Sequence, residues 1–292
     1  MLIVGHGEMG QAMEYLLAPR HRLDLWFRPH GSRRAAVTLE EAAGRADAVL
    51  LCVPAQPIGG LVERIRDRLP PHCSLWSIAK GLDDAGRPAA AILQGGLPPG
   101  QPWGVIYGPM ISEEIRAGRP AYAEVAGRPA EAVGAVRALF AGSHLHLQPA
   151  ADLVGLSWSA VLKNVYAMAF GGADGLGLGD NARGYLAAAA LAEMGAIVGA
   201  LGGSRETVYH LAGLGDLITT ATSAGSHHHE LGRRLVQGRA RELTGEGVHT
   251  LAMIRRHRLW AETPYPLLRV VRHMVETPAE AAGALRAFLE RR

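Results

Sequence analysis

The sequence predicts an α/β protein, with a doubly wound Rossmann-type sheet in the N-terminal half and an all-helical second domain. A Gly-x-Gly-x-x-Gly motif follows the first apolar segment, and short apolar segments then alternate with helical ones up to about residue 149. Strands that alternate with helices form a parallel sheet. At about 150 residues per domain, a chain of 292 residues holds two domains, which we place at 1–149 and 150–292.

The N-terminus has the order of elements that a dinucleotide site requires. Residues 2–4 are apolar and β-prone, Gly5-His6-Gly7-Glu8-Met9-Gly10 follows at once, and residues 11–17 have helical character. The first glycine permits the tight turn, the second lets the pyrophosphate approach the backbone, and the third lets the helix pack on the strand. The phosphates then lie at the positive end of the helix. We therefore assign residues 5–10 to cofactor binding.

The end of the second strand, predicted over residues 23–27, favours NADP. An NAD site carries an acidic residue there, whereas arginine accommodates the 2′-phosphate of NADP. Arg28 follows this strand and could hold the phosphate together with Arg33 or Arg34, whereas Asp24 lies too early, within the strand. We therefore expect NADP as cofactor, with NAD as the alternative.

The remaining strands of the first half place three further residues at a ligand-binding edge. Strands are predicted over residues 47–53, 74–79, 103–107, 121–126 and 145–148, with helices over 58–69 and 129–140. Ligands bind at the carboxyl ends of the strands in such sheets. Pro54, Lys80 and Gly108 follow three of these strands, and we assign Pro54 and Lys80 to the cofactor side of the site.

The second half is predicted to be helical throughout. Helices are expected over residues 154–170, 230–237, 247–257, 265–274 and 278–291, and a long one ends near residue 201. A glycine-rich loop over residues 171–179 precedes this long helix, and either Asp180 or Asn181 is expected to cap it. The histidines at 227–229 are placed on a loop.

Composition narrows the class of protein. Hydrophobic residues make up 48% and charged residues 20%, which is typical of globular proteins. Two cysteines form no disulfide framework and no signal-peptide pattern is present, so a cytoplasmic location is expected. No apolar run reaches the ~18 residues of a membrane span. A net charge of +3, without a basic stripe interleaved with aromatic residues, argues against a nucleic-acid partner.

Lysine is rare in this chain. Of 30 basic residues only Lys80 and Lys163 are lysines, and the others are arginines. Arginine serves positions that need only a positive charge, but it stays protonated, whereas a buried lysine can exchange a proton. The two lysines are either candidates for proton chemistry or chance survivors of a coding bias.

Several motifs occur in order and point to one family. They are Leu162-Lys163-Asn164-Val165, Ala173-Asp174-Gly175-Leu176-Gly177-Leu178-Gly179-Asp180-Asn181, Leu191-Ala192-Glu193-Met194 and Ala212-Gly213-Leu214-Gly215-Asp216-Leu217, with Ala79-Lys80-Gly81-Leu82, Gly108-Pro109 and Glu246-Gly247 as less specific ones. Together they resemble the NAD(P)-dependent sn-glycerol-3-phosphate dehydrogenases. The resemblance implies a 6-phosphogluconate-dehydrogenase-like fold, and reversible hydride transfer between NAD(P)H and dihydroxyacetone phosphate.

The resemblance also implies roles for single residues. Lys163 would be the general acid that protonates the new alkoxide, and the base in the reverse direction. Lys80 would polarise the same oxygen or hold substrate, and Asp216 would orient Lys163 and balance its charge. These roles suit hydride arrival at a carbonyl, because negative charge builds on the oxygen. The other implied residues are Asn164 and Gly108 for the substrate and Glu246 for the cofactor.

The sequence departs from the family pattern where the substrate phosphate is bound. The family carries Ser-Arg-Asn-Arg, and this chain has Ser226-His227-His228-His229. Imidazoles are fully charged only near or below pH ~6.5. Three alternatives follow: His227 and His228 hold phosphate weakly, Arg233 substitutes for them, or the substrate lacks phosphate. A metal site is not predicted, because adjacent histidines on a loop more often face solvent.

The sequence is thus identified as a divergent member of this family, acting on a small and phosphorylated molecule. Two other functions stay open. One is a reductase of another small carbonyl or 2-hydroxy compound, similar to ketopantoate reductases or β-hydroxyacid dehydrogenases. The other is a non-catalytic NADP-binding sensor. The alanine-rich helical domain is a candidate interface for a homodimer.

Overall fold

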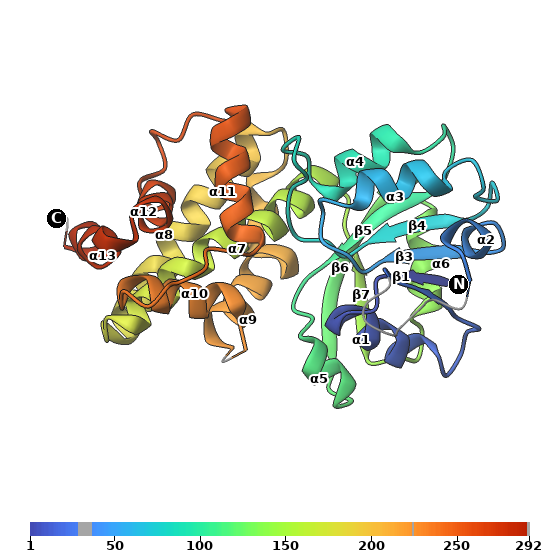
Figure 1. Ribbon diagram of the computed structural model, residues 1–292, viewed down its shortest axis with the longest axis horizontal. Helices are drawn as coiled ribbons and strands as arrows, with labels where there is room; N and C mark the ends of the chain where they lie inside the picture. Colours follow the sequence, from blue (N-terminus) through green and yellow to red (C-terminus); the bar gives the residue numbers. More distant parts are fainter. Residues whose placement is uncertain (29–36, 224, 291–292) are drawn as a thin grey trace. The chain divides into compact units, whose positions relative to one another are not determined.

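The computed structural model describes residues 1–28, 37–223 and 225–290, and the chain divides into two compact units (Figure 1). Unit 1 comprises Met1–Asp83 and Arg87–Leu153, and unit 2 comprises Asp84–Gly86 and Val154–Arg292. Unit 1 contains a seven-stranded sheet with helices on it, and unit 2 is built from helices. The predicted fold class is confirmed.

The sheet of unit 1 has the strand order β2-β1-β3-β4-β5-β6-β7. The chain moves outward from β1 first in one direction, to β2, and then in the other, to β3, so a topological switch point lies at the carboxyl end of β1. Ligands bind at such switch points in doubly wound sheets. The strands are β1 Leu2–Val4, β2 Asp24–Trp26, β3 Ala48–Leu51, β4 Ser74–Ser77, β5 Trp103–Tyr107, β6 Ala121–Arg128 and β7 Leu145–Pro149.

The expectation of a parallel sheet is wrong at one strand pair. All neighbouring strands are parallel except β5 and β6, which are antiparallel and pair Tyr107 with Glu124. The helix between them, α5 (Ser112–Arg116), is short, and the Tyr122 N–H already donates to the carbonyl of Pro109 at 3.2 Å. The chain therefore turns back at the carboxyl end of β5 and does not cross to the other end of the sheet, as a parallel connection must.

Helices cover the sheet and enclose its core. One buried cluster joins Met13 and Leu17 of α1, Ile115 of α5 and Val136 of α6 to inward-facing strand residues such as Ile106. Helix α3 contacts both α2 and α4, and α3 and α4 lie above the sheet in Figure 1. Helices α4 and α5 were not predicted. The helices are α1 Glu8–Leu17, α2 Leu39–Ala43, α3 Ile58–Ile65, α4 Ala89–Gly96, α5 Ser112–Arg116 and α6 Ala132–Leu139.

Unit 2 is organised around α7. This helix has the length and hydropathy of a membrane-spanning segment, which the sequence reading did not anticipate, but 89% of its most apolar window is buried in the fold. Such burial is typical of the core helix of a folded domain. The elements are α7 Leu153–Gly175, α8 Gly179–Ala200, 3₁₀ helix η1 Arg205–Tyr209, π-helix η2 Leu211–Gly215, α9 Asp216–Thr222, α10 His227–Val236, α11 Glu246–His257, α12 Pro266–Glu276, 3₁₀ helix η3 Pro278–Glu280 and α13 Ala281–Leu289.

Two predictions for the segment that joins α7 to α8 are wrong. The glycines at 171–175 belong to α7 and form no loop. A Cβ added at Gly171 would lie 1.7 Å from the His229 carbonyl oxygen, and one at Gly232 would lie 1.9 Å from that of Met168. The glycines therefore let α7 and α10 approach backbone to backbone. The predicted cap of α8 is also wrong, because Leu178 occupies that position and makes no side-chain capping bond.

Candidate functional site

The glycine turn after β1 has the shape that a dinucleotide site needs. Gly5 has φ +96°, and a Cβ there would lie 2.4 Å from the carbonyl oxygen of Cys52. A Cβ on Gly10 would lie 2.0 Å from the Gly5 carbonyl oxygen, whereas one on Gly7 would meet nothing within 4 Å. Gly5 and Gly10 are thus required by backbone packing, and Gly7 leaves space for a ligand above the start of α1.

A cavity of about 750 Å³ lies at this turn, within the usual size range of cofactor sites. Five residues that the sequence assigned to the cofactor line it: Gly5, His6, Gly7, Arg28 and Pro54. Glu8, Met9 and Gly10 form the first turn of α1 instead. Arg33 and Arg34 lie outside the described residues. The sequence reading missed Trp26, Phe27, Cys52, Val53, Gln56, Pro57 and Leu61, which also line the cavity.

The missed residues carried a usable signal, because most of them directly follow or end β2 and β3, the two neighbours of β1.

His6, in the glycine turn, is held by two neighbouring side chains. Its Nε2 lies 2.6 Å from Glu14 Oε2, and its ring stacks on Phe27 at 5.8 Å between centroids. The glycine turn is therefore held by side chains as well as by its backbone.

Lys80 and Gly108, both predicted site residues, lie together in unit 1. Lys80 follows β4 and Gly108 follows β5, so both stand at the carboxyl edge of the sheet. The Lys80 Nζ donates a hydrogen bond of 2.8 Å to the Gly108 carbonyl oxygen. A Cβ on Gly108 would lie 2.5 Å from the Tyr122 carbonyl oxygen. Gly108 thus fixes the position of an ammonium group at the edge where ligands bind.

The third predicted catalytic residue, Asp216, contacts Lys163 in unit 2. The Lys163 Nζ lies 3.2 Å from Asp216 Oδ1 and donates to Thr220 Oγ1 at 2.8 Å. Lys163 is 6% exposed and Asp216 is 3% exposed. A buried charge is tolerated only when it is paired and hydrogen-bonded. Thr220 was missed, although its i+4 spacing from Asp216 places both side chains on one face of α9.

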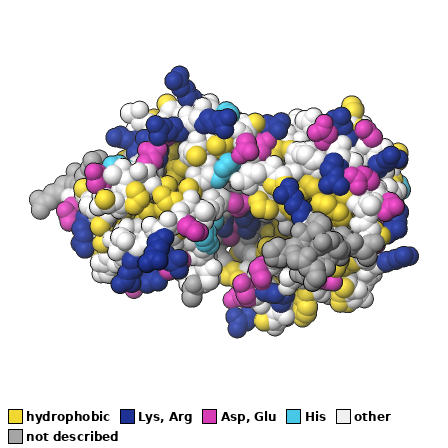
Figure 2. Space-filling view, in the orientation of Figure 1, with side chains coloured by type: hydrophobic (Ala, Val, Ile, Leu, Met, Phe, Trp, Pro, Cys, Tyr) yellow, Lys and Arg dark blue, Asp and Glu magenta, His cyan; other side chains and the backbone are white. Residues whose placement is uncertain are grey.

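Lys163 differs from the arginines of the described residues, because none of those arginines is buried. Basic and acidic side chains are interspersed over the visible surface of each unit (Figure 2), whereas Lys163 is buried and Lys80 is partly buried. Their positions favour a chemical role over chance survival.

Asn164 and Glu246 also come together in unit 2. Asn164 is 2% exposed, and its Nδ2 donates to Glu246 Oε2 at 3.4 Å. Glu246 begins α11, and a Cβ on the following Gly247 would lie 2.8 Å from the Asn164 carbonyl oxygen. The close approach of α11 to α7 therefore explains the glycine of the Glu-Gly pair.

The histidines at 227–229 form the first turn of α10, so their assignment to a loop is wrong. Ser226 caps the helix, accepting from the His229 N–H at 3.3 Å. Each ring has a different neighbour. His227 Nε2 lies 3.0 Å from the Thr244 carbonyl oxygen, His228 Nε2 accepts from the Gly247 N–H at 3.1 Å, and His229 Nε2 lies 2.7 Å from Asp174 Oδ2.

His228 does not carry the positive charge that a phosphate clamp needs. Burial lowers the pKa of His228 to about 3, and the electrostatic effects of neighbouring Lys163 and His227 act in the same direction. The ring is therefore neutral near pH 7. Arg233, the other candidate, forms a two-pronged ion pair with Glu230 at 2.7 and 3.0 Å. In the described part of the chain, no three His, Cys, Asp or Glu side chains are placed to hold a metal ion.

Comparison with known proteins gives the same family over both halves. Models of the NAD-dependent glycerol-3-phosphate dehydrogenase N-terminus and C-terminus match residues 30–133 and 152–285. A glycerol-3-phosphate dehydrogenase (NAD(P)+) from Gloeobacter violaceus is 34% identical over 97% of this chain and 95% of its own. The crystal structure of glycerol-3-phosphate dehydrogenase from Coxiella burnetii superposes with a TM-score of 0.86, at 25% identity, covering 99% of this chain and 98% of that chain.

A ketopantoate reductase from Ralstonia eutropha superposes less closely. Its TM-score is 0.58 at 15% identity, covering 97% of this chain and 100% of that chain. This likeness concerns the fold alone.

Proposed function

Because this chain belongs to the NAD-dependent glycerol-3-phosphate dehydrogenase family, we propose that it interconverts dihydroxyacetone phosphate and sn-glycerol 3-phosphate, with Lys163 moving the proton. The family makes the chain an NAD(P)-dependent oxidoreductase that acts on a CH–OH group. The observation that carries the proposal is the buried cluster of Lys163, Asp216 and Thr220.

We propose that residues 1–149 form the dinucleotide-binding domain. The backbone of residues 5–7 and the N-terminus of α1 would hold the pyrophosphate, since N–H groups and the helix dipole both attract anions there. Arg28, at the rim of the same cavity, would bind the 2′-phosphate of NADP. The bound nicotinamide supplies or accepts the hydride. NADP is therefore the preferred cofactor in this proposal, with NAD as the alternative.

Residues 150–292 would supply the proton chemistry. Hydride addition to the carbonyl leaves an alkoxide, and Lys163 donates its proton to this oxygen. Asp216 and Thr220 hold the ammonium in place, and Asp216 balances its charge. In the oxidative direction the neutral amine of Lys163 takes the hydroxyl proton. Asn164, oriented by Glu246, would bind a substrate hydroxyl.

Lys80 has a different role in this proposal. The Gly108 carbonyl fixes its ammonium group, which would stabilise the negative charge that develops on the substrate oxygen. This role needs a positive charge at a fixed place and does not need proton transfer.

For the substrate phosphate we propose His227 as a ligand, with His228 as a neutral donor. The Nε2 of His228 accepts from Gly247, so its proton lies on Nδ1, which can donate one hydrogen bond. A substrate phosphate held this way is bound more weakly than by the arginine of the family pattern.

The exposed side of α8 is our proposed homodimer interface, and sedimentation of the purified chain tests whether a dimer forms.

The proposed function is tested by turnover. Purified chain is mixed with NADPH and dihydroxyacetone phosphate, and with a panel of other small carbonyl compounds that includes ketopantoate. We expect NADPH oxidation with dihydroxyacetone phosphate to exceed that with the rest of the panel. Faster NADPH oxidation with another carbonyl compound would identify that compound as the substrate in place of dihydroxyacetone phosphate. Cofactor binding without any turnover would favour the function of a sensor.

The role of Lys163 is tested by Lys163→Arg. This variant keeps the charge but cannot release a proton near neutral pH, so kcat should fall by about 10²- to 10⁴-fold, with NADPH affinity unchanged. The matched variant Lys80→Arg keeps the charge where only charge is proposed to matter, and should lose less. A near-normal rate in Lys163→Arg would refute the assignment of Lys163.

A further inference from the structure

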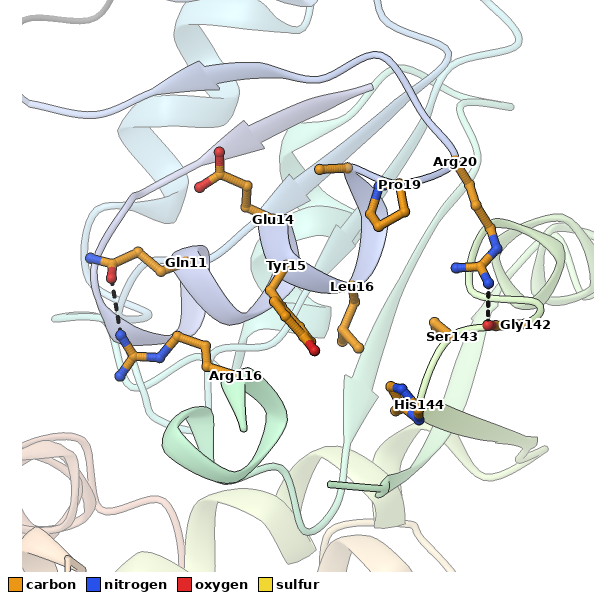
Figure 3. A pocket seen from close by; sticks show the side chains of 11 residues that line it. Gln11, Glu14, Tyr15, Leu16, Pro19, Arg20, Arg116, Gly142, Ser143 and His144 are labelled. Atoms are coloured by element: carbon orange, nitrogen blue, oxygen red, sulfur yellow. Dashed lines mark hydrogen bonds between the residues drawn. The ribbon is translucent and has the colours of Figure 1, made fainter. Parts of the chain in front are cut away.

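A second cavity, of about 700 Å³, lies in unit 1 and shares no lining residue with the cofactor cavity. It is bounded by α1 and the turn that follows it, by α5, and by the segment 142–144 that precedes β7 (Figure 3). No role assigned above uses it.

The floor of this cavity is apolar and aromatic. Leu16, Ala18 and Pro19 contribute carbon atoms, and Tyr15 is 45% exposed. Figure 3 shows Tyr15 between Arg116 on one side and Arg20 with His144 on the other. An exposed aromatic ring that lies between cationic groups suits a flat ligand with a negative charge.

The two guanidinium groups differ in their partners. Arg116 forms an ion pair with Glu8 and donates to Gln11 Oε1 at 3.1 Å. Arg20 donates to the Gly142 carbonyl oxygen, and among the described residues it has no carboxylate within ion-pair distance. Its position is thus fixed by a neutral acceptor while its charge is not balanced. An anionic group is therefore best placed at Arg20, next to His144.

We propose that this cavity is a second small-molecule site, which takes a ligand with a flat apolar body over Tyr15 and an anionic group at Arg20. Burial of the apolar body against Tyr15 and Leu16 and a charge-assisted hydrogen bond from Arg20 both favour binding.

Two polar residues of the site also bond to the glycine turn. Glu14 Oε2 lies 2.6 Å from His6 Nε2, and Gln11 Nε2 donates to the His6 carbonyl oxygen at 3.4 Å. His6 itself lines the cofactor cavity. A ligand that displaces Gln11 or Glu14 therefore changes the affinity of the turn for the dinucleotide. This coupling rests on the proposed cofactor binding, and the existence of the site does not.

The site is tested with anilinonaphthalene sulfonate, an anionic fluorescent probe with a flat naphthalene ring, added to the full chain in saturating NADP+ so that the cofactor cavity is occupied. We expect saturable fluorescence, with an affinity that falls on the order of tenfold in Arg20→Ser and in Tyr15→Ala. The uncharged analogue N-phenylnaphthylamine should be insensitive to Arg20→Ser.

Two matched variants serve as controls. Arg66→Ser removes an exposed arginine at the C-cap of α3. Tyr122→Ala removes a tyrosine that is 44% exposed and, by strand alternation from the buried Ala121 and Ala123, faces away from α1. Both should bind the probe as the unchanged chain does. No saturable binding, or equal loss in the controls, would overturn the proposed site.

The coupling is measured separately, as the Kd of NADP+ with and without saturating probe. Thermodynamic linkage requires the two ligands to change each other's affinity by the same factor. We expect a factor different from one, which moves toward one in Gln11→Leu because the bond of Gln11 to the glycine turn is removed. A factor of one in the unchanged chain would refute the coupling and leave the site, whereas absence of NADP+ binding would refute the proposed function instead.

Discussion

Lys163 and His228 lie in the same part of unit 2, yet their surroundings treat a positive charge differently. Lys163 has the Asp216 carboxylate at 3.2 Å. His228 accepts an amide hydrogen bond from Gly247, and burial together with nearby Lys163 and His227 lowers its pKa to about 3, from 6.5. Lys163 thus has an acidic partner, whereas the surroundings of His228 favour the neutral form of its ring.

His228 should therefore make the chain sensitive to acid. Between about pH 6.5 and about pH 3, the unfolded chain binds a proton at this residue that the folded chain does not. The stabilisation that the neutral His228 contributes is therefore fully present above the pKa of the unfolded chain, and it is lost as the pH falls through this window. The free energy of unfolding of the unchanged chain should fall between about pH 7 and about pH 5. In His228→Asn this fall should be smaller by about 1–2 kcal/mol, measured by urea unfolding at both pH values. The exposed histidine variant His72→Asn is the control, and an equal effect there would contradict the prediction.

At the level of elements, the crossing of α7 and α10 depends on two glycines. A Cβ at Gly171 or Gly232 would overlap a backbone carbonyl of the other helix, which no side-chain rotation can relieve. We expect Gly171→Ala and Gly232→Ala to destabilise the chain by about 2 kcal/mol or more, and to lower activity because α10 carries the histidine turn. The measurement is the thermal midpoint.

Gly283→Ala in α13 is the matched control for this crossing. A Cβ there meets nothing within 4 Å, so alanine should be neutral or stabilising by about 0.5–1 kcal/mol, since glycine is the poorer helix former. Equal effects at all three glycines would show that helix propensity, and not the crossing, determines the result.

The same glycines show where sequence reasoning succeeds and fails. The turn at residues 5–10 was recognised because its spacing is local and its neighbours are a strand and a helix. The run at 171–175 was taken for a loop, because the partner that requires glycine, the His229 carbonyl, lies far along the chain. The antiparallel β6 was missed for a similar reason, since the direction of this strand depends on where the chain leaves α5 and not on the strand's own residues. Lys163 and Asp216 were found through motifs, whereas Thr220 became visible only when α9 was seen to turn it toward Lys163.

At the scale of the whole molecule, the cofactor cavity and the Lys163 cluster belong to different units, each with its own core. A chain of this kind need not unfold in one step, and a ligand stabilises the part of the chain that binds it. The dinucleotide should thus act on the unfolding of unit 1.

NADP+ should raise the midpoint temperature at which unit 1 unfolds, as measured by calorimetry of the full chain. At about 100 times its Kd the expected stabilisation is about 2.7 kcal/mol. Arg28→Ala removes the proposed contact to the 2′-phosphate and should weaken NADP+ by about tenfold, so that the same concentration stabilises by only about 1.4 kcal/mol. Stabilisation by NAD+, which lacks that phosphate, should not change. Lys163→Arg should keep the full effect of NADP+, because this residue is proposed to act on the substrate. If Arg28→Ala lowered the affinity for NADP+ and NAD+ equally, Arg28 would support the cavity wall and would not bind the 2′-phosphate.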